Sequence, residues 1–122
     1  MPAAENSVTT VRLGERGYVL AVGGELDMHT VEPLREQLET LRTVDRLQLV
    51  VDLARVSFVD SIALGVLVEA AKRARSGGGE VVVVSDDPRV RRVFEITGLD
   101  RMVRVERSLA ETVEQLVVAS SS

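Results

Sequence analysis

The chain has 122 residues and a formal net charge of −4, from 19 acidic and 15 basic residues, and this length suits a single domain. It has no Cys and one His, which excludes a disulfide framework, a thiolate metal site, a Cys nucleophile and a multi-histidine metal site. The acidic balance argues against a nucleic-acid partner, and we expect no metal and no cofactor.

The first residues, MPAAENS, lack the basic start and apolar stretch of a signal peptide. No apolar run approaches the roughly 18 residues needed to span a bilayer. We therefore expect a cytoplasmic protein with no membrane contact. Residues 1–7 and 119–122 are small and polar, so we expect flexible termini around one domain at residues 8–118.

Two strands are predicted first. Residues 8–13 alternate apolar and polar side chains, which is typical of a half-buried strand. Residues 18–22 form a second apolar segment after the turn at residues 14–17. This arrangement predicts a β-hairpin at the start of the domain.

An amphipathic helix is predicted next, over about residues 30–43. Either Asp27 or Thr30 could cap it, and Pro33 falls in its first turn, where a missing N–H is tolerated. The helical spacing is set by four apolar residues, Val31, Leu34, Leu38 and Leu41.

A buried strand and a second helix follow. Residues 47–53 are a nearly continuous apolar run, interrupted only by Gln48 and Asp52, which indicates a strand covered on both faces. A helix is predicted from about Ser61 to Arg75, ending at the glycines 77–79. These glycines follow a helix and precede a strand, so they indicate helix termination rather than a phosphate-binding loop.

The remaining elements complete an α/β pattern. Strands that alternate with helices after a hairpin predict a mixed, mostly parallel sheet of about five strands with about four helices. The last elements are a buried strand at residues 80–85, a helix opened by Asp87 and Pro88 and stopped by Gly98, a strand at residues 102–105 and a helix at residues 108–118.

Polar residues gather where two of the predicted helices begin, at residues 23–30 and 57–67, and such loops often carry function. Asp60 or Ser61 occupies the second cap region, so the Ser61 hydroxyl lies near unsatisfied N–H groups that attract anions. A phosphoryl group on Ser61 would be tolerated there. The alternative is that Asp60 and Ser61 are only a capping pair, and the local sequence leaves both interpretations open.

Gly65 falls inside the same predicted helix, where a glycine costs about 1 kcal/mol relative to alanine. Its presence suggests the close approach of a backbone. That backbone could belong to the sheet of this domain or to a partner protein.

A hydrolase triad built from Ser61, His29 and an aspartate is a competing hypothesis. Such a nucleophile needs a base within hydrogen-bond reach that is oriented by a third group. Ser61 does not lie in a Gly-x-Ser-x-Gly turn, and His29 is more simply a surface side chain at a helix start. We therefore expect a protein that is not an enzyme.

Three motifs together resemble the STAS domain family, named for sulfate transporters and anti-sigma-factor antagonists. They are the segment Gly24-Glu25-Leu26-Asp27, the segment Asp60-Ser61-x-x-Leu64-Gly65, and residues 94–99, Phe-Glu-Ile-Thr-Gly-Leu. The resemblance covers roughly residues 8–118. It is strongest to the stand-alone anti-sigma-factor antagonists.

The resemblance implies a function in switchable protein binding. In this family, the Ser that follows the motif Asp is phosphorylated by an ATP-dependent serine kinase that is also the anti-sigma factor. The unphosphorylated antagonist binds that kinase and releases the sigma factor, and a phosphatase restores the binding form. By resemblance Ser61 is the phosphoacceptor, and the expected partner-binding residues are Asp27, Asp60, Ser61, Ile62 and Gly65. No sequence feature indicates an oligomer, so we expect a monomer by default.

The sequence departs from the family pattern at Ile62 and Ala63, where members commonly carry a small residue such as Ser or Thr and then Gly. The departure bears on which kinase accepts the site. It also keeps a second hypothesis open, a STAS binding or scaffold module that phosphorylation does not regulate.

Overall fold

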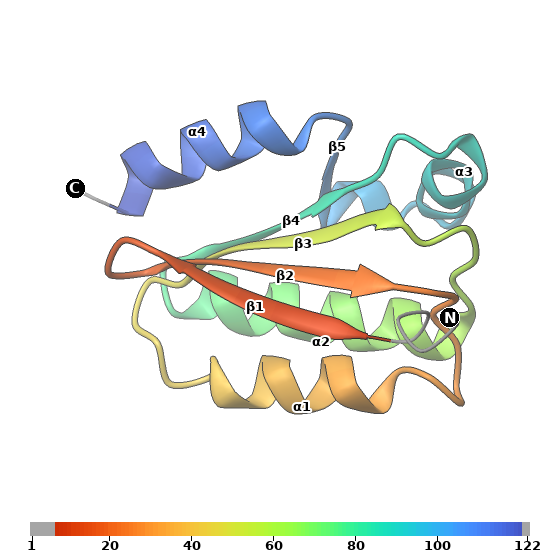
Figure 1. Ribbon diagram of the computed structural model, residues 1–122, viewed down its shortest axis with the longest axis horizontal. Helices are drawn as coiled ribbons and strands as arrows, with labels where there is room; N and C mark the ends of the chain where they lie inside the picture. Colours follow the sequence, from red (N-terminus) through yellow and green to blue (C-terminus); the bar gives the residue numbers. More distant parts are fainter. Residues whose placement is uncertain (1–6, 121–122) are drawn as a thin grey trace.

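The computed structural model describes residues 7–120, so most of the two termini predicted to be flexible lie outside the described residues. The elements alternate after an opening hairpin (Figure 1). In chain order they are β1 (Val8–Leu13), β2 (Gly17–Gly23), α1 (Glu32–Thr40), β3 (Gln48–Arg55), α2 (Ser61–Ser76), β4 (Glu80–Val84), α3 (Pro88–Thr97), the 3-10 helix η2 (Leu99–Arg101), β5 (Arg104–Glu106) and α4 (Leu109–Ser120).

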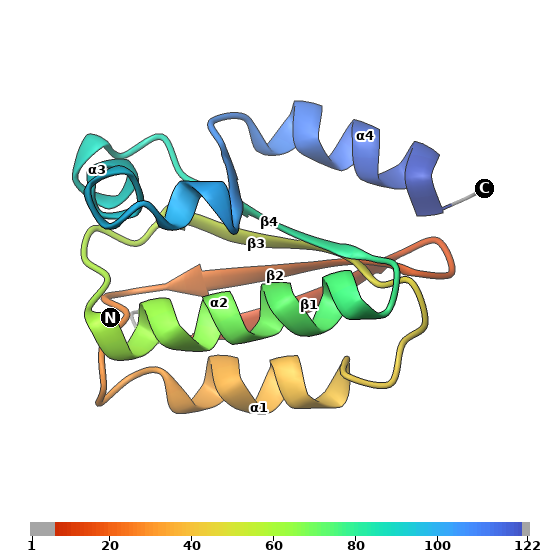
Figure 2. The same ribbon diagram turned by 180° about the vertical axis from the view of Figure 1, so that it is seen from behind.

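The sheet has the order β1-β2-β3-β4-β5. β1 pairs with β2 in antiparallel fashion, and every later pair is parallel. Helices α1 and α2 lie side by side on one face, α4 covers the other face, and α3 lies at one end of the sheet (Figures 1 and 2). The predicted mixed sheet with an N-terminal hairpin is confirmed.

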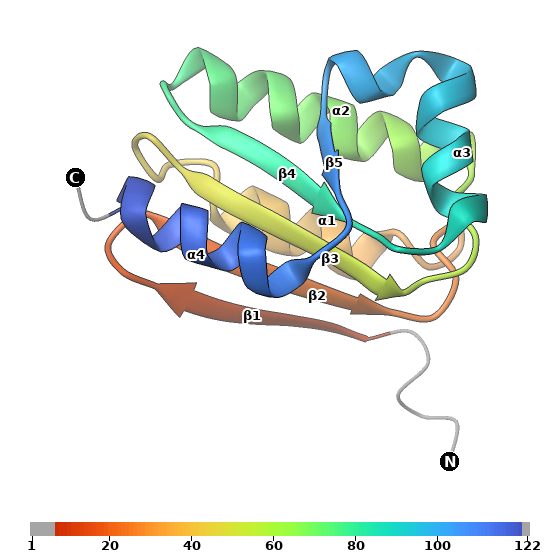
Figure 3. The same ribbon diagram turned by 90° about the horizontal axis from the view of Figure 1, so that it is seen from above.

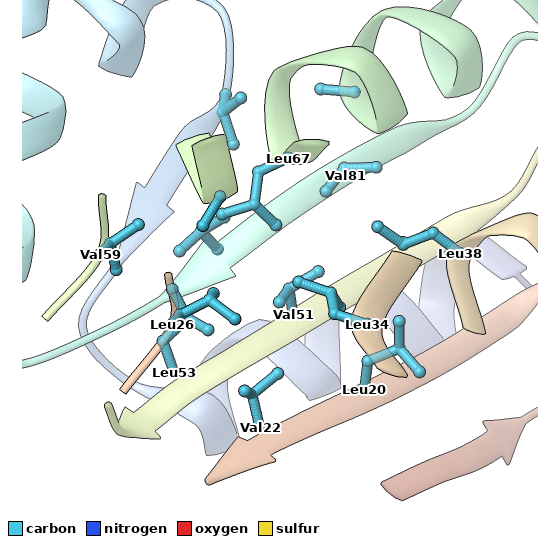
Figure 4. Close-up of a cluster of buried hydrophobic side chains, with 14 of the residues drawn as sticks. Leu20, Val22, Leu26, Leu34, Leu38, Val51, Leu53, Val59, Leu67 and Val81 are labelled. Carbon is cyan, nitrogen blue, oxygen red and sulfur yellow. The ribbon is translucent and has the colours of Figure 1, made fainter. Parts of the chain in front are cut away.

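The main core lies between the sheet and helices α1 and α2. Its side chains are mostly Leu and Val. Leu20 of β2, Val51 of β3 and Leu67 of α2 are completely buried within it (Figure 4). A second, smaller cluster on the other face packs Val19 and Val50 beneath Leu116 of α4. Aliphatic side chains thus fill both layers of this aromatic-poor protein, as expected for packed sheets.

Several boundaries predicted from the sequence are confirmed by specific caps. The Asp60 side chain caps α2, and Gly77 ends that helix. Asp87 and Pro88 open α3, and Gly98 ends it with φ 76°. A positive φ of this kind favours glycine.

Three predictions about local structure need correction. The first helix is shorter than predicted, and its N-cap is Val31, with no side-chain cap from Asp27 or Thr30. The first strand is more exposed than predicted, because it is the edge of the sheet and α4, on one face, lies over the inner strands instead (Figure 3). The last strand is Arg104–Glu106 rather than residues 102–105, because the backbone N–H of Met102 closes the turn of η2.

Within residues 7–120, no helix is both long and apolar enough to cross a bilayer.

Candidate functional site

The two polar segments singled out in the sequence meet at one edge of the sheet. β2 and β3 are parallel, so their carboxyl ends lie at the same edge, where ligands and partners of open α/β sheets commonly bind. Beyond the strands, Leu26 and Val59 form an isolated parallel bridge. The Leu26 N–H donates to the Phe58 carbonyl at 2.9 Å, and the Asp60 N–H donates to the Leu26 carbonyl at 3.1 Å. Both bridging side chains are buried, side by side (Figure 4).

The Asp60 carboxylate joins the two segments a second time. Its Oδ1 accepts a hydrogen bond from the Ala63 N–H at 2.9 Å, which caps α2. Its Oδ2 accepts from the Met28 N–H, also at 2.9 Å. One carboxylate therefore fixes the loop before α1 against the first turn of α2.

The Asp27 carboxylate organises its own loop rather than a helix. Its Oδ1 accepts from the His29 N–H at 2.9 Å and from the Thr30 N–H at 3.1 Å. The Thr30 hydroxyl donates to the Glu25 carbonyl at 2.6 Å and accepts from the Asp27 N–H at 3.0 Å. The hydrogen bond from His29, supported by those from Thr30, holds the pKa of the Asp27 carboxyl below its ordinary value, and a smaller desolvation cost opposes this lowering.

Ser61 is the first residue of α2, and its side chain is exposed. The cap of this helix comes from Asp60, so the helix does not need the Ser61 hydroxyl for capping. Modification of that hydroxyl would place a negative group at the positive end of a helix that runs from Ser61 to Ser76.

Three large apolar side chains are exposed close to Ser61, two of them near it in the sequence and one in the loop that Asp60 holds. Met28 is 63% exposed, Phe58 50% and Ile62 46%. We define Met28, Phe58, Ser61 and Ile62 as the Ser61 surface. Sequence reasoning selected Ile62 but missed Met28 and Phe58 as surface residues. Of the two positions that depart from the family pattern, Ile62 lies on this surface and Ala63 is completely buried.

Gly65 lies one turn further along α2, and its position is exposed. A Cβ atom built on this residue meets no other atom within 4 Å, apart from its chain neighbours and the local helix backbone. The close packing within the fold, which the sequence left open, is therefore absent at this position. Gly65 lines a groove of about 370 Å³ between α1 and α2.

The groups of this site that could take part in chemistry are the Ser61 hydroxyl, the carboxylates of Asp27 and Asp60, and His29. Among the described residues, no group of three His, Cys, Asp or Glu side chains is placed to hold a metal ion. His29 is exposed and contributes its backbone N–H to the Asp27 turn. The arrangement presents a hydroxyl, an apolar surface and two carboxylates that hold the loops in place.

Comparisons with known proteins agree with this architecture. A model of the STAS domain family matches residues 8–114. The anti-sigma-B factor antagonist of Staphylococcus aureus is 36% identical over 91 residues, which cover 75% of this chain and 84% of the relative.

Two solved structures are similar over most of their length. An anti-sigma factor antagonist from Mycobacterium paratuberculosis has a TM-score of 0.77 and 28% identity, over 91% of this chain and 95% of the other. The Bacillus cell fate determinant SpoIIAA in its phosphorylated form has a TM-score of 0.71 and 21% identity, over 90% and 99% of the two chains. At 21% identity the second likeness concerns the fold alone.

Proposed function

The chain belongs to the STAS domain family, and from that premise we propose that it is an anti-sigma-factor antagonist that phosphorylation of Ser61 switches off. In this proposal the unphosphorylated protein binds an anti-sigma serine kinase through the Ser61 surface and thereby releases a sigma factor. A serine phosphatase returns the modified protein to its binding form. The bacterial relatives are named as anti-sigma factor antagonists, and these names support the proposal that this chain is an antagonist of an anti-sigma factor.

The observation that carries the proposal is the position of Ser61. Ser61 is an exposed residue at the start of α2, while the neighbouring Asp60 provides the helix cap and the link to Met28. A kinase can therefore modify Ser61 without removing a hydrogen bond on which the helix start depends. Exposed apolar side chains on the same surface offer a partner an area to bury.

Electrostatics explains why a phosphate there would act on binding rather than on folding. Phosphorylation adds about −1.5 to −2 charges at neutral pH, and an exposed helix N-terminus returns only about 0.3–1 kcal/mol for such a charge. In an interface, two like charges about 4 Å apart at an effective dielectric constant near 20 repel by about 4 kcal/mol. At 1.4 kcal/mol per factor of ten, this weakens binding on the order of a thousandfold.

Each predicted partner-binding residue has a distinct place in this proposal. Ser61 and Ile62 contact the partner directly. Asp60 and Asp27 hold the loop that carries Met28, as their hydrogen bonds indicate. Gly65 leaves room for the partner along α2.

The test begins with intact-mass analysis of the protein after incubation with ATP and each anti-sigma serine kinase encoded in the same genome. We expect one phosphate on the wild type and none on Ser61→Ala. In a titration with that kinase, wild type and Ser61→Ala should bind alike. The phosphorylated form should bind about a thousandfold more weakly, and Ser61→Asp, with one charge, should fall between. Equal affinities for all forms would leave the second hypothesis, a binding module that phosphorylation does not regulate.

A further inference from the structure

A groove between α1 and α2 extends along α2 from Ile62, next to Ser61. α2 lines it with a stripe of six residues, Ile62, Gly65, Val66, Glu69, Ala70 and Arg73. These positions recur at three- and four-residue intervals, so they lie on one face of the helix. From Ile62 to Arg73 the stripe is about 16 Å long at 1.5 Å per residue, which equals three helical turns.

The floor of the groove is apolar, and its rim is electrically balanced. Leu38 of α1, with Val66 and Ala70 of α2, lies within it. At its far end, Arg73 lies 3.6 Å from Glu39 of α1 and 3.8 Å from Glu69 of α2. Arg35 of α1 also lines the groove, so two arginines balance two glutamates around it. Such a groove selects an apolar insert rather than a highly charged segment.

Gly65 has the smallest side chain of the α2 residues that line the groove. Glycine lowers helix stability at this position, and no atom of the fold takes up the room that it leaves. The distance between two packed helices depends on the side chains at their contact, so a glycine lets a second helix approach most closely.

We propose that the groove between α1 and α2 receives an amphipathic helix of the anti-sigma kinase. The apolar face of that helix packs against α2 and approaches it most closely at Gly65. This inference rests on the proposed function and names the partner element that the same site receives. A three-turn groove with an apolar floor matches the way amphipathic helices bind to grooves, through anchors at i, i+3, i+4 and i+7.

The kinase is the occupant because the groove continues the Ser61 surface. Ile62 belongs to both, so a kinase that holds Ser61 near its ATP already lies over the mouth of the groove. A second copy of this chain fits less well. Away from the site, the exposed large apolar residues on the described helices are Ile96 of α3 and the neighbours Val117 and Val118 of α4. None of these sets forms a three-turn stripe.

Substitutions at Gly65 test the inference because they affect folding and binding in opposite directions. The probe is the serine kinase that phosphorylates Ser61 in the experiment above. Gly65→Ala should raise the thermal unfolding midpoint and weaken kinase binding severalfold. Gly65→Leu should fold with a midpoint no lower than that of the wild type and weaken binding by tenfold or more. Ala110→Leu adds the same side chain to an exposed position of α4, on the other face of the sheet, and should bind like wild type.

The same binding measurements distinguish a failure of this inference from a failure of the proposed function. If wild type is phosphorylated and binds while Gly65→Leu binds equally well, the groove is empty in the complex and this inference alone is overturned. If wild type is neither phosphorylated nor bound by the kinase, the proposed function fails and the inference fails with it. A wild type that dimerises in sedimentation while Gly65→Leu stays monomeric would assign the groove to a second copy and overturn the inference.

Discussion

One glycine near the start of helix α2, Gly65, and one just beyond its end, Gly79, have opposite surroundings. Near the start, a Cβ on Gly65 would meet nothing within 4 Å. Just beyond the end, a Cβ on Gly79 would lie 2.6 Å from the Leu47 nitrogen and closer still to its carbonyl oxygen. One glycine leaves space open to solvent, and the other allows two backbone segments to touch.

This difference shows which of the two glycines the fold itself requires, namely Gly79. At the far end, the Gly79 N–H donates to the Ala74 carbonyl, and the Glu80 N–H donates to the Leu47 carbonyl, both at 2.8 Å. These bonds join the end of α2 and the start of β4 to the start of β3. Near the start, no contact of the fold requires a glycine at position 65, which agrees with the proposal that a partner approaches there. The glycine at the far end is structural, and the one near the start is the residue at which we propose that the partner approaches.

The largest expected effect on stability comes from substituting the two glycines in parallel. Gly79→Ala should lower the free energy of unfolding by about 3 kcal/mol, because a methyl group cannot enter the contact with Leu47 without moving the backbone. Gly65→Ala should raise it by up to about 1 kcal/mol, because alanine is the better helix former. Urea denaturation measures both values. A Gly79→Ala variant as stable as wild type would break the comparison.

A smaller effect should follow from Asp60→Asn, which separates the two hydrogen bonds of this side chain. Asparagine caps helices about as well as aspartate, but its single acceptor oxygen can serve Ala63 or Met28 and not both. We expect the free energy of unfolding to change by less than about 1 kcal/mol, while the Met28 amide exchanges faster and kinase binding weakens. Asp60→Ala removes both bonds and should cost about 1–2 kcal/mol. Unchanged Met28 exchange in Asp60→Asn would show that the link between the loops does not depend on this carboxylate.

Much of this fold could be predicted because its signals are local. The Asp60 cap, the Asp87-Pro88 start and the Gly98 stop each follow from preferences of single residues at helix ends. The start of α1 was predicted wrongly for a related reason. Asp27 and Thr30 have the side chains of a cap, but they form a turn with each other and with Glu25, so the helix begins after Val31 without a side-chain cap.

The site could be predicted only in part because it is made by contacts between distant segments. The sequence places Asp60 and Ser61 at a helix start, but no local pattern shows that Asp60 also holds Met28, 32 positions earlier. The exposure of Phe58 depends on how the bridge between Leu26 and Val59 turns the chain. The meaning of Gly65 was likewise open until the space around it was known. The presence of an exposed aromatic residue could not be inferred from composition alone.

The smallest effect concerns the loop that Asp27 organises at the functional end. The folded-state pKa of the Asp27 carboxyl is lowered. The negative charge of Asp27 therefore stabilises the folded protein at pH values above the unfolded-state pKa, which lies near the ordinary value of 3.8. That contribution is lost as the pH falls through the folded-state pKa. Asp27→Asn keeps the acceptor oxygen and removes only the charge. We therefore expect it to be slightly less stable than wild type at pH 6, and the difference should vanish as both are titrated into acid below about pH 3.8.

A matched control, Asp87→Asn, distinguishes the two ways in which these carboxyl pKa values are lowered. The pKa of Asp87 is lowered first by a side-chain hydrogen bond from the Arg89 guanidinium, whereas that of Asp27 is lowered first by the backbone N–H of His29. Salt screens an exposed ion pair, since the Debye length falls to about 3 Å at 1 M. The deficit of Asp87→Asn should therefore shrink at high salt, and that of Asp27→Asn should remain. High salt could also remove the stability deficit of Asp27→Asn. In that case surrounding charges, rather than the backbone hydrogen bonds to Asp27, stabilise the loop before α1. That loop, which carries Met28, would then be held less rigidly than these hydrogen bonds indicate.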